Sequence, residues 1–198
     1  MPRKADKQLE GRILDAAYQL WSKGGERALT MRAVAITAKT TTPTLYERFR
    51  DKHDLIEFLR VRARERMFAA LKPAKSTLEA CRLGMEFALA NGNEYLLLTS
   101  DWAERFARKE PMPSYEYLKA KLAGDFGGSA EDYTQLAMAL VAQVHGTTLL
   151  LLGEGLEVHI VKDFKDACLE ACQALIEYGG KRVGEGRLRE PRKSEAKI

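Results

Sequence analysis

Apolar side chains recur at helical spacing along nearly the whole chain, and this periodicity constrains the fold more than any other feature. Near the N-terminus they follow the i, i+4, i+7, i+8 spacing that lines one face of an amphipathic helix: Leu9, Ile13, Ala16, Ala17, Leu20 and Trp21. Alternation of apolar and polar residues, which is typical of a half-buried strand, appears in neither half of the sequence. The sequence therefore predicts an all-α protein.

Clusters of glycine, proline and asparagine divide this pattern into about nine predicted helices. Gly24 and Gly25 end the first helix, Thr30 is a good N-cap for a short second helix, and Thr41 is a good N-cap for a third. Six longer helices are predicted after them, over residues 52–71, 77–90, 94–109, 114–126, 131–153 and 163–178.

Charge is distributed unevenly along the chain, although the net charge is only +4. Residues 1–66 hold 15 Lys and Arg against 9 Asp and Glu, whereas residues 67–180 hold 10 against 16. A basic segment of this kind favours a polyanionic partner such as nucleic acid or an acidic membrane surface. Within it, the run from Arg60 to Phe68 is either a stripe that follows phosphates or a solvated helix face. Residues 181–198 hold 7 against 3 without an apolar stripe, so we expect a disordered basic tail.

The cysteines indicate a reducing compartment. Cys81, Cys168 and Cys172 are too few and too unevenly placed for a disulfide scaffold, and no signal-peptide pattern opens the chain, so the cytoplasm is the simplest location. Cys168 and Cys172 lie one helical turn apart and could sense oxidants or hold a metal. Because no histidine or third cysteine stands at ligand spacing, we expect buried small hydrophobic residues, with no metal and no cofactor.

A stretch without any charged residue runs from Tyr133 to Gly153 and has about the length of a membrane span. Gln135, Gln143 and His145 lie inside it, and polar groups at bilayer depth cost several kcal/mol. We therefore expect a buried helix of a protein that does not enter a membrane.

The third predicted helix has an unusual exposed face. If Thr41 is its N-cap, Leu45 and Phe49 point inward, and the outward face carries Thr42, Pro43, Tyr46, Glu47 and Arg50. Small hydroxyls, a rigid proline and a phenol can approach base edges and thymine methyls in a DNA major groove, and the free N–H groups at the helix start suit phosphate oxygens. Two short helices joined by a short turn form a helix-turn-helix, with the second helix as the reader.

The same segment carries a distributed motif. It combines an I-L-x-A-A opening, a threonine-led second helix, and T-L-Y-x-x-F followed by lysine and leucine, at Ile13, Leu14, Ala16, Ala17, Thr30, Val34, Ala35, Thr44, Leu45, Tyr46, Phe49, Lys52 and Leu55. In this pattern residues 13–59 resemble the DNA-binding domain of the tetracycline-repressor-like (TetR) family of bacterial transcription regulators.

The resemblance implies a set of DNA-binding residues. The N-terminal residues of the third helix would lie near bases and its tyrosine near a phosphate, while an arginine early in the second helix would reach a base or a phosphate. An arginine and a lysine that follow the third helix's tyrosine would lie near the sugar-phosphate backbone of the DNA. The implied set is Thr30, Arg32, Thr41, Thr42, Pro43, Thr44, Tyr46, Arg48 and Lys52.

Two positions depart from the family pattern. The family's turn glycine is Lys39 here, and the valine that follows it is Thr40. A residue other than glycine in a left-handed turn costs about 1 kcal/mol, so the turn is either reshaped or less stable. Lys39 also adds a cation near the predicted DNA face.

The resemblance also implies domains. Residues 1–52 would bind DNA and residues 53–180 would bind a small-molecule effector and form a homodimer through the last two long helices, which fits the uncharged run. His145 and Gly146 are similar to an H-G element in one class of the family's regulatory domains. Since effector pockets are mostly apolar with a few polar anchors, the candidate ligand-binding residues are Met85, Leu89, Tyr95, Trp102, Phe106, Tyr115 and His145, with core packing as the alternative for each.

These observations favour a dimeric regulator, a repressor, that binds near-palindromic operator DNA and is released by a small molecule. An enzyme is poorly supported, because His53, His145 and His159 stand apart and no nucleophile, metal or phosphate-loop motif occurs. A non-specific DNA-binding or ligand-binding helical protein without a defined operator stays open as the alternative.

Overall fold

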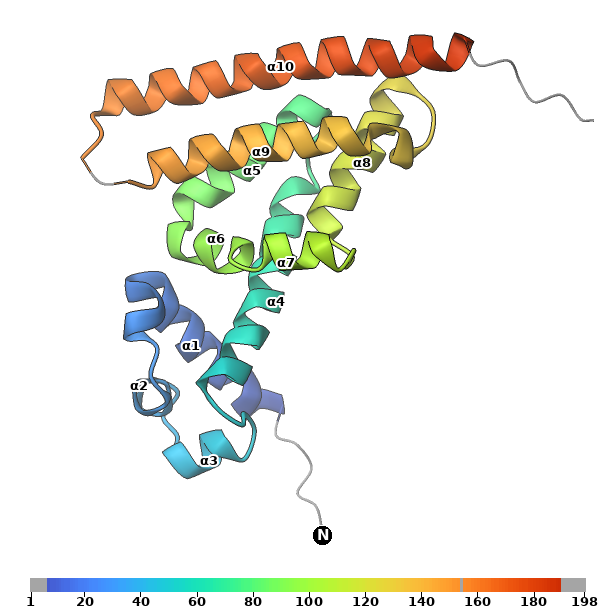
Figure 1. Cartoon of the computed structure of the whole chain (residues 1–198). Helices are drawn as coiled ribbons and strands as arrows, with labels where there is room; N and C mark the ends of the chain where they lie inside the picture. The colour runs from blue at the N-terminus through green and yellow to red at the C-terminus, as the bar shows by residue number, and fades with distance from the viewer. Residues whose placement is uncertain (1–6, 154, 190–198) are drawn as a thin grey trace, which may run out of the picture. The chain divides into compact units, whose positions relative to one another are not determined.

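The structure, a computed structural model, describes residues 7–153 and 155–189 of the chain. Within these residues every regular element is helical, which confirms the predicted all-α class (Figure 1). The elements are α1 (Lys7–Ala28), α2 (Met31–Thr37), α3 (Thr42–Tyr46), α4 (Lys52–Leu71), α5 (Thr77–Ala90), α6 (Gly92–Thr99), α7 (Trp102–Ala107), α8 (Pro113–Phe126), the 3-10 helix η1 (Ala130–Tyr133), α9 (Thr134–Leu151) and α10 (Val158–Arg189).

The chain forms two compact units. The first contains the residues up to Arg66 together with Ala90–Lys109, and the second contains Met67–Leu89 with the residues from Glu110 onward. Helices α6 and α7 therefore pack with the N-terminal helices, although a long stretch of sequence separates them. The predicted division into domains at residue 52 concerns function and stays a prediction.

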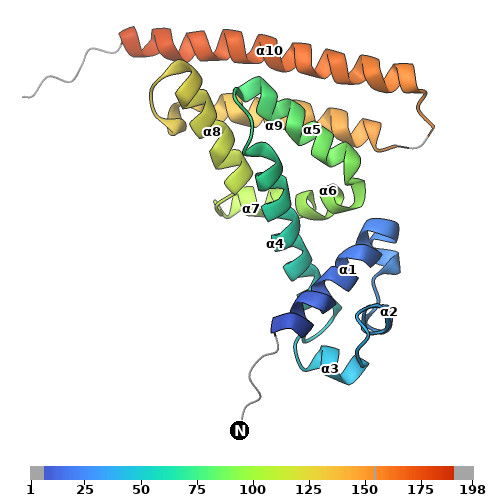
Figure 2. The same ribbon diagram turned by 180° about the vertical axis from the view of Figure 1, so that it is seen from behind.

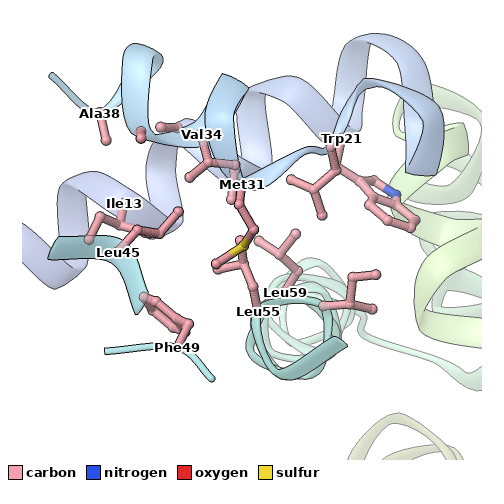
Figure 3. Close-up of a cluster of buried hydrophobic side chains, with 14 of the residues drawn as sticks. Ile13, Trp21, Met31, Val34, Ala38, Leu45, Phe49, Leu55 and Leu59 are labelled. Atoms are coloured by element: carbon pink, nitrogen blue, oxygen red, sulfur yellow. The ribbon is translucent and has the colours of Figure 1, made fainter. Parts of the chain in front are cut away.

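The core of the first unit is built from one apolar stripe of each helix. Side chains from α1, α2, α3 and α4 point toward one another (Figure 3), and Ile13, Val34, Leu45 and Leu55 are fully buried. Leu97 of α6 belongs to the same cluster. Burying a side chain of this size stabilises a fold by roughly 1.5 to 3 kcal/mol, so this cluster holds the short helices in place.

The second unit contains α5, α8, η1, α9 and α10. Helices α9 and α10 lie side by side in both views (Figure 1, Figure 2). Leu122 of α8 and Leu140 of α9 are fully buried, and Tyr133 is buried with its hydroxyl donating to the carbonyl of Gly127 at 2.7 Å. The start of α5 is fixed because Thr77 donates from both its backbone N–H (2.9 Å) and its hydroxyl (2.7 Å) to Asp125.

Most predicted helix bounds are confirmed, but the predicted helix over residues 94–109 is wrong. Two helices, α6 and α7, take its place, so the described residues hold ten α-helices and one 3-10 helix where about nine helices were predicted. The hydroxyls of Thr99 and Ser100 donate to the carbonyls of Tyr95 (2.9 Å) and Leu97 (2.8 Å), which occupies the acceptors at the end of α6. Asp101 then pairs with Arg64 of α4, outside either helix.

The predicted disordered tail is wrong for residues 181–189, because α10 continues to Arg189. The remainder of that prediction, residues 190–198, lies outside the described residues. Gly179 and Gly180 do not end the helix: they let it approach its neighbours. A Cβ at Gly179 would lie 2.8 Å from Leu136, and one at Gly180 would lie 2.6 Å from the ring of Phe126. Gly24 and Gly25, by contrast, interrupt α1 with non-helical torsions, as predicted.

The segment Ala130–Leu151 is long and apolar enough to cross a membrane by length and composition alone, with a mean hydropathy of 1.2. Of its most apolar window, 33% is buried in this chain. The helix that was predicted to be buried is therefore only partly buried within this single chain, and Met138, Leu149 and Leu150 are exposed. A single such helix is weak evidence for a membrane span, since core helices of other proteins pass the same test.

Replacing Gly180 by alanine should destabilise the protein. The added methyl would overlap the Phe126 ring, and overpacking of this kind costs about 1 to 3 kcal/mol. The matched control is Gly124→Ala in α8, where nothing lies within 4 Å of the added methyl and the better helix propensity of alanine should stabilise by roughly 0.5 to 1 kcal/mol. Urea unfolding measures both, and equal effects at the two sites would contradict this account of α10.

Candidate nucleic-acid interface

The helix-turn-helix formed by α2 and α3 begins each helix with a threonine cap. Thr30 accepts a hydrogen bond from the backbone N–H of Ala33 at 3.1 Å, and Thr41 accepts one from the backbone N–H of Thr44 at 3.3 Å. Both predicted N-caps are confirmed, and Pro43 lies in the first turn of α3, where its missing N–H is not needed. The caps therefore fix where both helices start.

The turn between the two helices keeps a glycine-type geometry without a glycine. Lys39 has a φ of 53°, in the left-handed region. The backbone N–H of Thr40 donates to the carbonyl of Ala35 at 2.9 Å and that of Lys39 to Ile36 at 3.1 Å, the pair of bonds that normally closes a helix with glycine at this position. The turn is therefore not reshaped, and Lys39 carries backbone strain.

The inner face of α3 is anchored and its outer face is open. Leu45 is fully buried, and Phe49 just after the helix packs edge to face on Phe58 with ring centroids 5.3 Å apart, as its predicted inward position requires. Pro43 is exposed, and half of Tyr46 is exposed (51%), so a proline and a phenol face outward. Two short helices whose second member presents this face form an arrangement that fits a DNA groove.

Some of the hydroxyls on this face are already used within it. The hydroxyls of Thr41 and Thr44 lie 2.9 Å apart and hydrogen-bond to each other. Thr41 therefore serves the helix first, and the more available groups are the Thr42 side chain, which is half-buried, and the Tyr46 hydroxyl. In a major groove these two could hydrogen-bond to base edges or to phosphate oxygens.

Lys52, at the start of α4, is held by the end of α1. Its Nζ donates to the carbonyl of Glu26 at 3.1 Å and lies 3.3 Å from the Glu26 carboxylate. Together with Gly24 and Arg27, these two residues line an open hollow of about 470 Å³. Sequence reasoning placed Lys52 near phosphate but missed Glu26, because a contact between residues so far apart leaves no local signal.

All nine predicted DNA-binding residues lie in the first unit. Arg32 is exposed on the first turn of α2, and Arg48 is half-buried after α3. The nine lie on α2 and α3, at the N-caps of these helices, after α3 and at the start of α4, and their contact with DNA stays a prediction. Ile36 of α2 is an exposed apolar residue next to this face that the sequence analysis did not identify. It is 68% exposed, and its position outside the buried stripe of Met31, Val34 and Ala35 is the sequence signal that could have identified it.

The arginines of α4 have partners within the same unit. Arg62 lies 2.6 Å from Asp15, Arg64 pairs with Asp101, and Arg66 lies 2.9 Å from Glu94. The sequence left two interpretations of the run from Arg60 to Phe68, a stripe that follows phosphates or a solvated helix face. In the described structure, three of its arginines instead form ion pairs with acidic residues of α1, α6 and the segment after α6.

The candidate ligand-binding residues divide between the two units. Met85, Leu89, Tyr115 and His145 belong to the second, whereas Tyr95, Trp102 and Phe106 belong to the first. Met85 and Tyr115 are buried, and the hydroxyl of Tyr115 donates to the carbonyl of Thr134 at 2.9 Å, which favours a packing role for that residue. His145 is half-buried, and burial lowers its pKa. Tyr95 packs edge to face on Trp102 at 6.3 Å. A ligand role for the seven stays a prediction.

The three thiols are buried in the second unit. Hydrogen bonding with the Cys81 thiol and burial raise the pKa of Cys172, and burial raises the pKa of Cys168. Raised pKa values disfavour the reactive thiolate, in agreement with the predicted role as small hydrophobic residues. Among the described residues no group of three possible ligands is placed to hold a metal ion.

Comparisons with known proteins agree with this geometry. Residues 13–59 match the family described as bacterial regulatory proteins, tetR family. The HTH-type transcriptional repressor KstR of Rhodococcus jostii (strain RHA1) is 41% identical over 81 residues, which cover 40% of this chain and 38% of KstR, well under half of that repressor's length.

Two solved structures share the fold over most of the chain. A TetR-like transcriptional regulator from Rhodococcus sp. RHA1 has a TM-score of 0.57 at 22% identity, covering 89% of this chain and 98% of that one. A variant of TetR from Acinetobacter baumannii AYE, in complex with minocycline, has a TM-score of 0.54 at 21% identity, covering 95% and 100%. At these identities the likeness shows the fold alone.

Replacing Lys39 by glycine should stabilise the helix-turn-helix. Glycine adopts a positive φ without the Cβ clash, so Lys39→Gly should be more stable than Lys39→Ala by up to about 1 kcal/mol. Both variants remove the same charge, which makes alanine the matched control for the backbone effect. Thermal unfolding compares the two, and a less stable glycine variant would show that the turn is not strained.

Proposed function

Because the chain belongs to the tetR family of bacterial regulatory proteins, we propose that this transcriptional regulator is a ligand-responsive repressor. It binds near-palindromic operator DNA as a homodimer and is released when a small molecule occupies its second domain. The first 52 residues bind DNA, residues 53–180 bind the effector and the partner copy, and the protein acts in the cytoplasm without catalysing a reaction. The repressor named above supports the direction of regulation by likeness only.

The exposed face of α3 carries this proposal. Helix α3 contributes Leu45 to the core from its inner face, whereas the opposite face presents Thr42, Pro43 and Tyr46 outward. In a major groove, the threonine contacts bases and the tyrosine hydroxyl donates to a phosphate oxygen, while Arg32 and Arg48 supply charge and Lys52, which is paired with Glu26, lies near a phosphate. Thr30 caps the start of α2, and Thr41, hydrogen-bonded to Thr44, caps the start of α3.

The homodimer is supported by exposed apolar side chains on α9 and α10. Leu150 is 60% exposed, Val158 87% and Tyr178 70%, and further exposed residues on the same helices are Met138, Leu149 and Phe164. A partner copy that covers these side chains would form a four-helix bundle with two α9 and two α10 helices. The apolar character of α9 is then explained by burial against protein instead of lipid.

Effector release requires that the ligand prefer one of two states of the protein. It must bind better to the state whose two α3 helices are wrongly spaced for the operator, since a ligand with no such preference shifts nothing. Helix α4 begins at Lys52, in the proposed DNA-binding segment, and ends at Leu71, in the second unit. A movement of this helix would therefore transmit the effect of the ligand to the DNA-binding segment. The ligand contacts fall to members of the seven-residue candidate set.

Removing the Tyr46 hydroxyl should weaken operator binding. Tyr46→Phe loses one hydrogen bond to a charged phosphate, so the dissociation constant should rise about tenfold. Tyr117→Phe, in α8, removes a hydroxyl that makes only long contacts of 3.4 and 3.5 Å and should leave the affinity unchanged. Fluorescence anisotropy with DNA from upstream of the gene and scrambled DNA, at two salt concentrations, measures both. Equal, salt-sensitive binding to the two DNAs would favour the non-specific alternative.

Placing a charge on the exposed face of α9 should break the dimer. Leu150→Glu would bury an unpaired carboxylate in the proposed bundle, which costs several kcal/mol, and should give a monomer at micromolar concentration with weakened operator binding. Leu96→Glu in α6 makes the same change at a side chain that is 45% exposed and should leave a dimer. Sedimentation velocity distinguishes the two, and a dimeric Leu150→Glu protein would place the interface elsewhere.

A further inference from the structure

Glu94, on α6, is a buried carboxylate in the first unit. It is 1% exposed, and its position next to Asn93 and Tyr95 places it where α6 packs with the N-terminal helices. Burial of a charged group is unfavourable unless the group is paired and hydrogen-bonded. The burial of Glu94 therefore needs an explanation, and the proposed contact of α3 with DNA does not give one.

Three side chains from two other helices surround this carboxylate. The hydroxyl of Tyr18 (α1) donates to Glu94 Oε2, and Arg66 (α4) donates to the same oxygen at 2.9 Å. The guanidinium groups of Arg66 and Arg62 stand over the Tyr18 ring at 4.7 and 5.2 Å from its centroid. These four residues are called the Glu94 cluster below. Arg62 also forms an ion pair with Asp15 of α1, with 2.6 Å between the guanidinium nitrogen and the carboxylate oxygen.

The hydrogen bonding of Glu94 is one-sided. Both donors use Oε2, whereas the buried Oε1 accepts no hydrogen bond from the protein. A neutral carboxyl group tolerates such an environment better than a carboxylate does, because an unpaired oxygen carries less charge. The arrangement satisfies the ionised form only partly.

A second contact fixes α6 at the neighbouring residue. The indole N–H of Trp21 donates to the carbonyl of Asn93 at 2.7 Å, and the Asn93 amide donates to the carbonyl of Ser22 at 3.0 Å. Both partners lie on α1, whose Ile13 and Ala17 are fully buried in the core against which α2, α3 and α4 pack. Through α1, the position of α6 is coupled to the helix-turn-helix.

We propose that Glu94 is a positioning residue for DNA binding, which docks α6 on α1 and α4 through Tyr18 and Arg66 and makes that docking depend on its own proton. The proposal rests on the proposed function for its effect on operator affinity. The docking itself concerns the fold of the first unit and is measurable without DNA.

The direction of the pH dependence follows from the surroundings of Glu94. Burial raises its pKa to about 7, against the opposing attraction of Arg66 and Arg62. The groups that face it are Tyr18, Arg66 and Arg62, with Asp15 one contact further away. Because docking favours the protonated form, the docked state gains stability below about pH 7 and loses it as the pH rises through 7. Between pH 6 and 8 this weakens docking by about tenfold.

Native-state hydrogen exchange of the full-length protein tests the docking, with Glu94→Gln as the main variant. Glutamine is permanently neutral and keeps an oxygen for Tyr18. In wild type, the opening of α6, corrected for intrinsic exchange rates, should rise about tenfold from pH 6 to 8 and stay constant in Glu94→Gln. Glu104→Gln removes an exposed carboxylate from α7 of the same unit, where it pairs with Arg108, and should behave as wild type.

Operator binding by the same three proteins tests the positioning role. The ratio of the wild-type to the Glu94→Gln dissociation constant should be near one at pH 6 and rise up to about tenfold at pH 8, because the two proteins differ only at residue 94. The same pH dependence of exchange in wild type and Glu94→Gln would overturn the proposal. So would a constant ratio of dissociation constants. If wild type bound no DNA selectively at any pH, the proposed function would fail, and the exchange data would still decide whether Glu94 controls docking.

Discussion

The burial of Leu45 and Phe49 against α1 and α4 is the constraint on which the rest of this structure depends. Helix α3 has five residues, far fewer than a helix needs to persist alone in water, so tertiary packing is its main source of stability. The same packing turns Tyr46 and Pro43 outward. A change that loosened this core would therefore disrupt the proposed DNA-binding surface without altering any residue on it.

The parts of the fold that could be predicted are those decided within one turn of helix. Thr30 and Thr41 cap helices because a side-chain oxygen satisfies an N–H three residues later, and the bounds of α4 and α5 follow from similar local signals. Gly180 could not be interpreted this way. Its role depends on Phe126, which lies far away in sequence, so a pattern that normally ends a helix lies within one here.

The candidate site divides along the same line. Its exposed face was predictable from the spacing around Tyr46. The sequence leaves the turn at Lys39 open between a reshaped and a less stable form, and the φ of 53° shows the left-handed, less stable one. The contact of Glu26 with Lys52 and the burial of Glu94 next to Tyr18 were not predictable, because each joins elements distant in sequence. Polar networks between elements decide which charges are available, and they become visible only once the helices are packed.

This availability changes how the basic N-terminal segment should be understood. The excess of Lys and Arg over Asp and Glu in residues 1–66 predicted a polyanion partner, yet Arg62, Arg64 and Arg66 pair with acidic residues of the same unit. Their charge holds α4 to α1 and α6, and a group already neutralised adds little to phosphate attraction. Exposed cations such as Arg32 and Lys39 remain on α2 and the turn, so the attraction is concentrated where α3 would meet the groove. Part of the charge that the composition suggests for DNA binding thus serves to hold the helices of the first unit together.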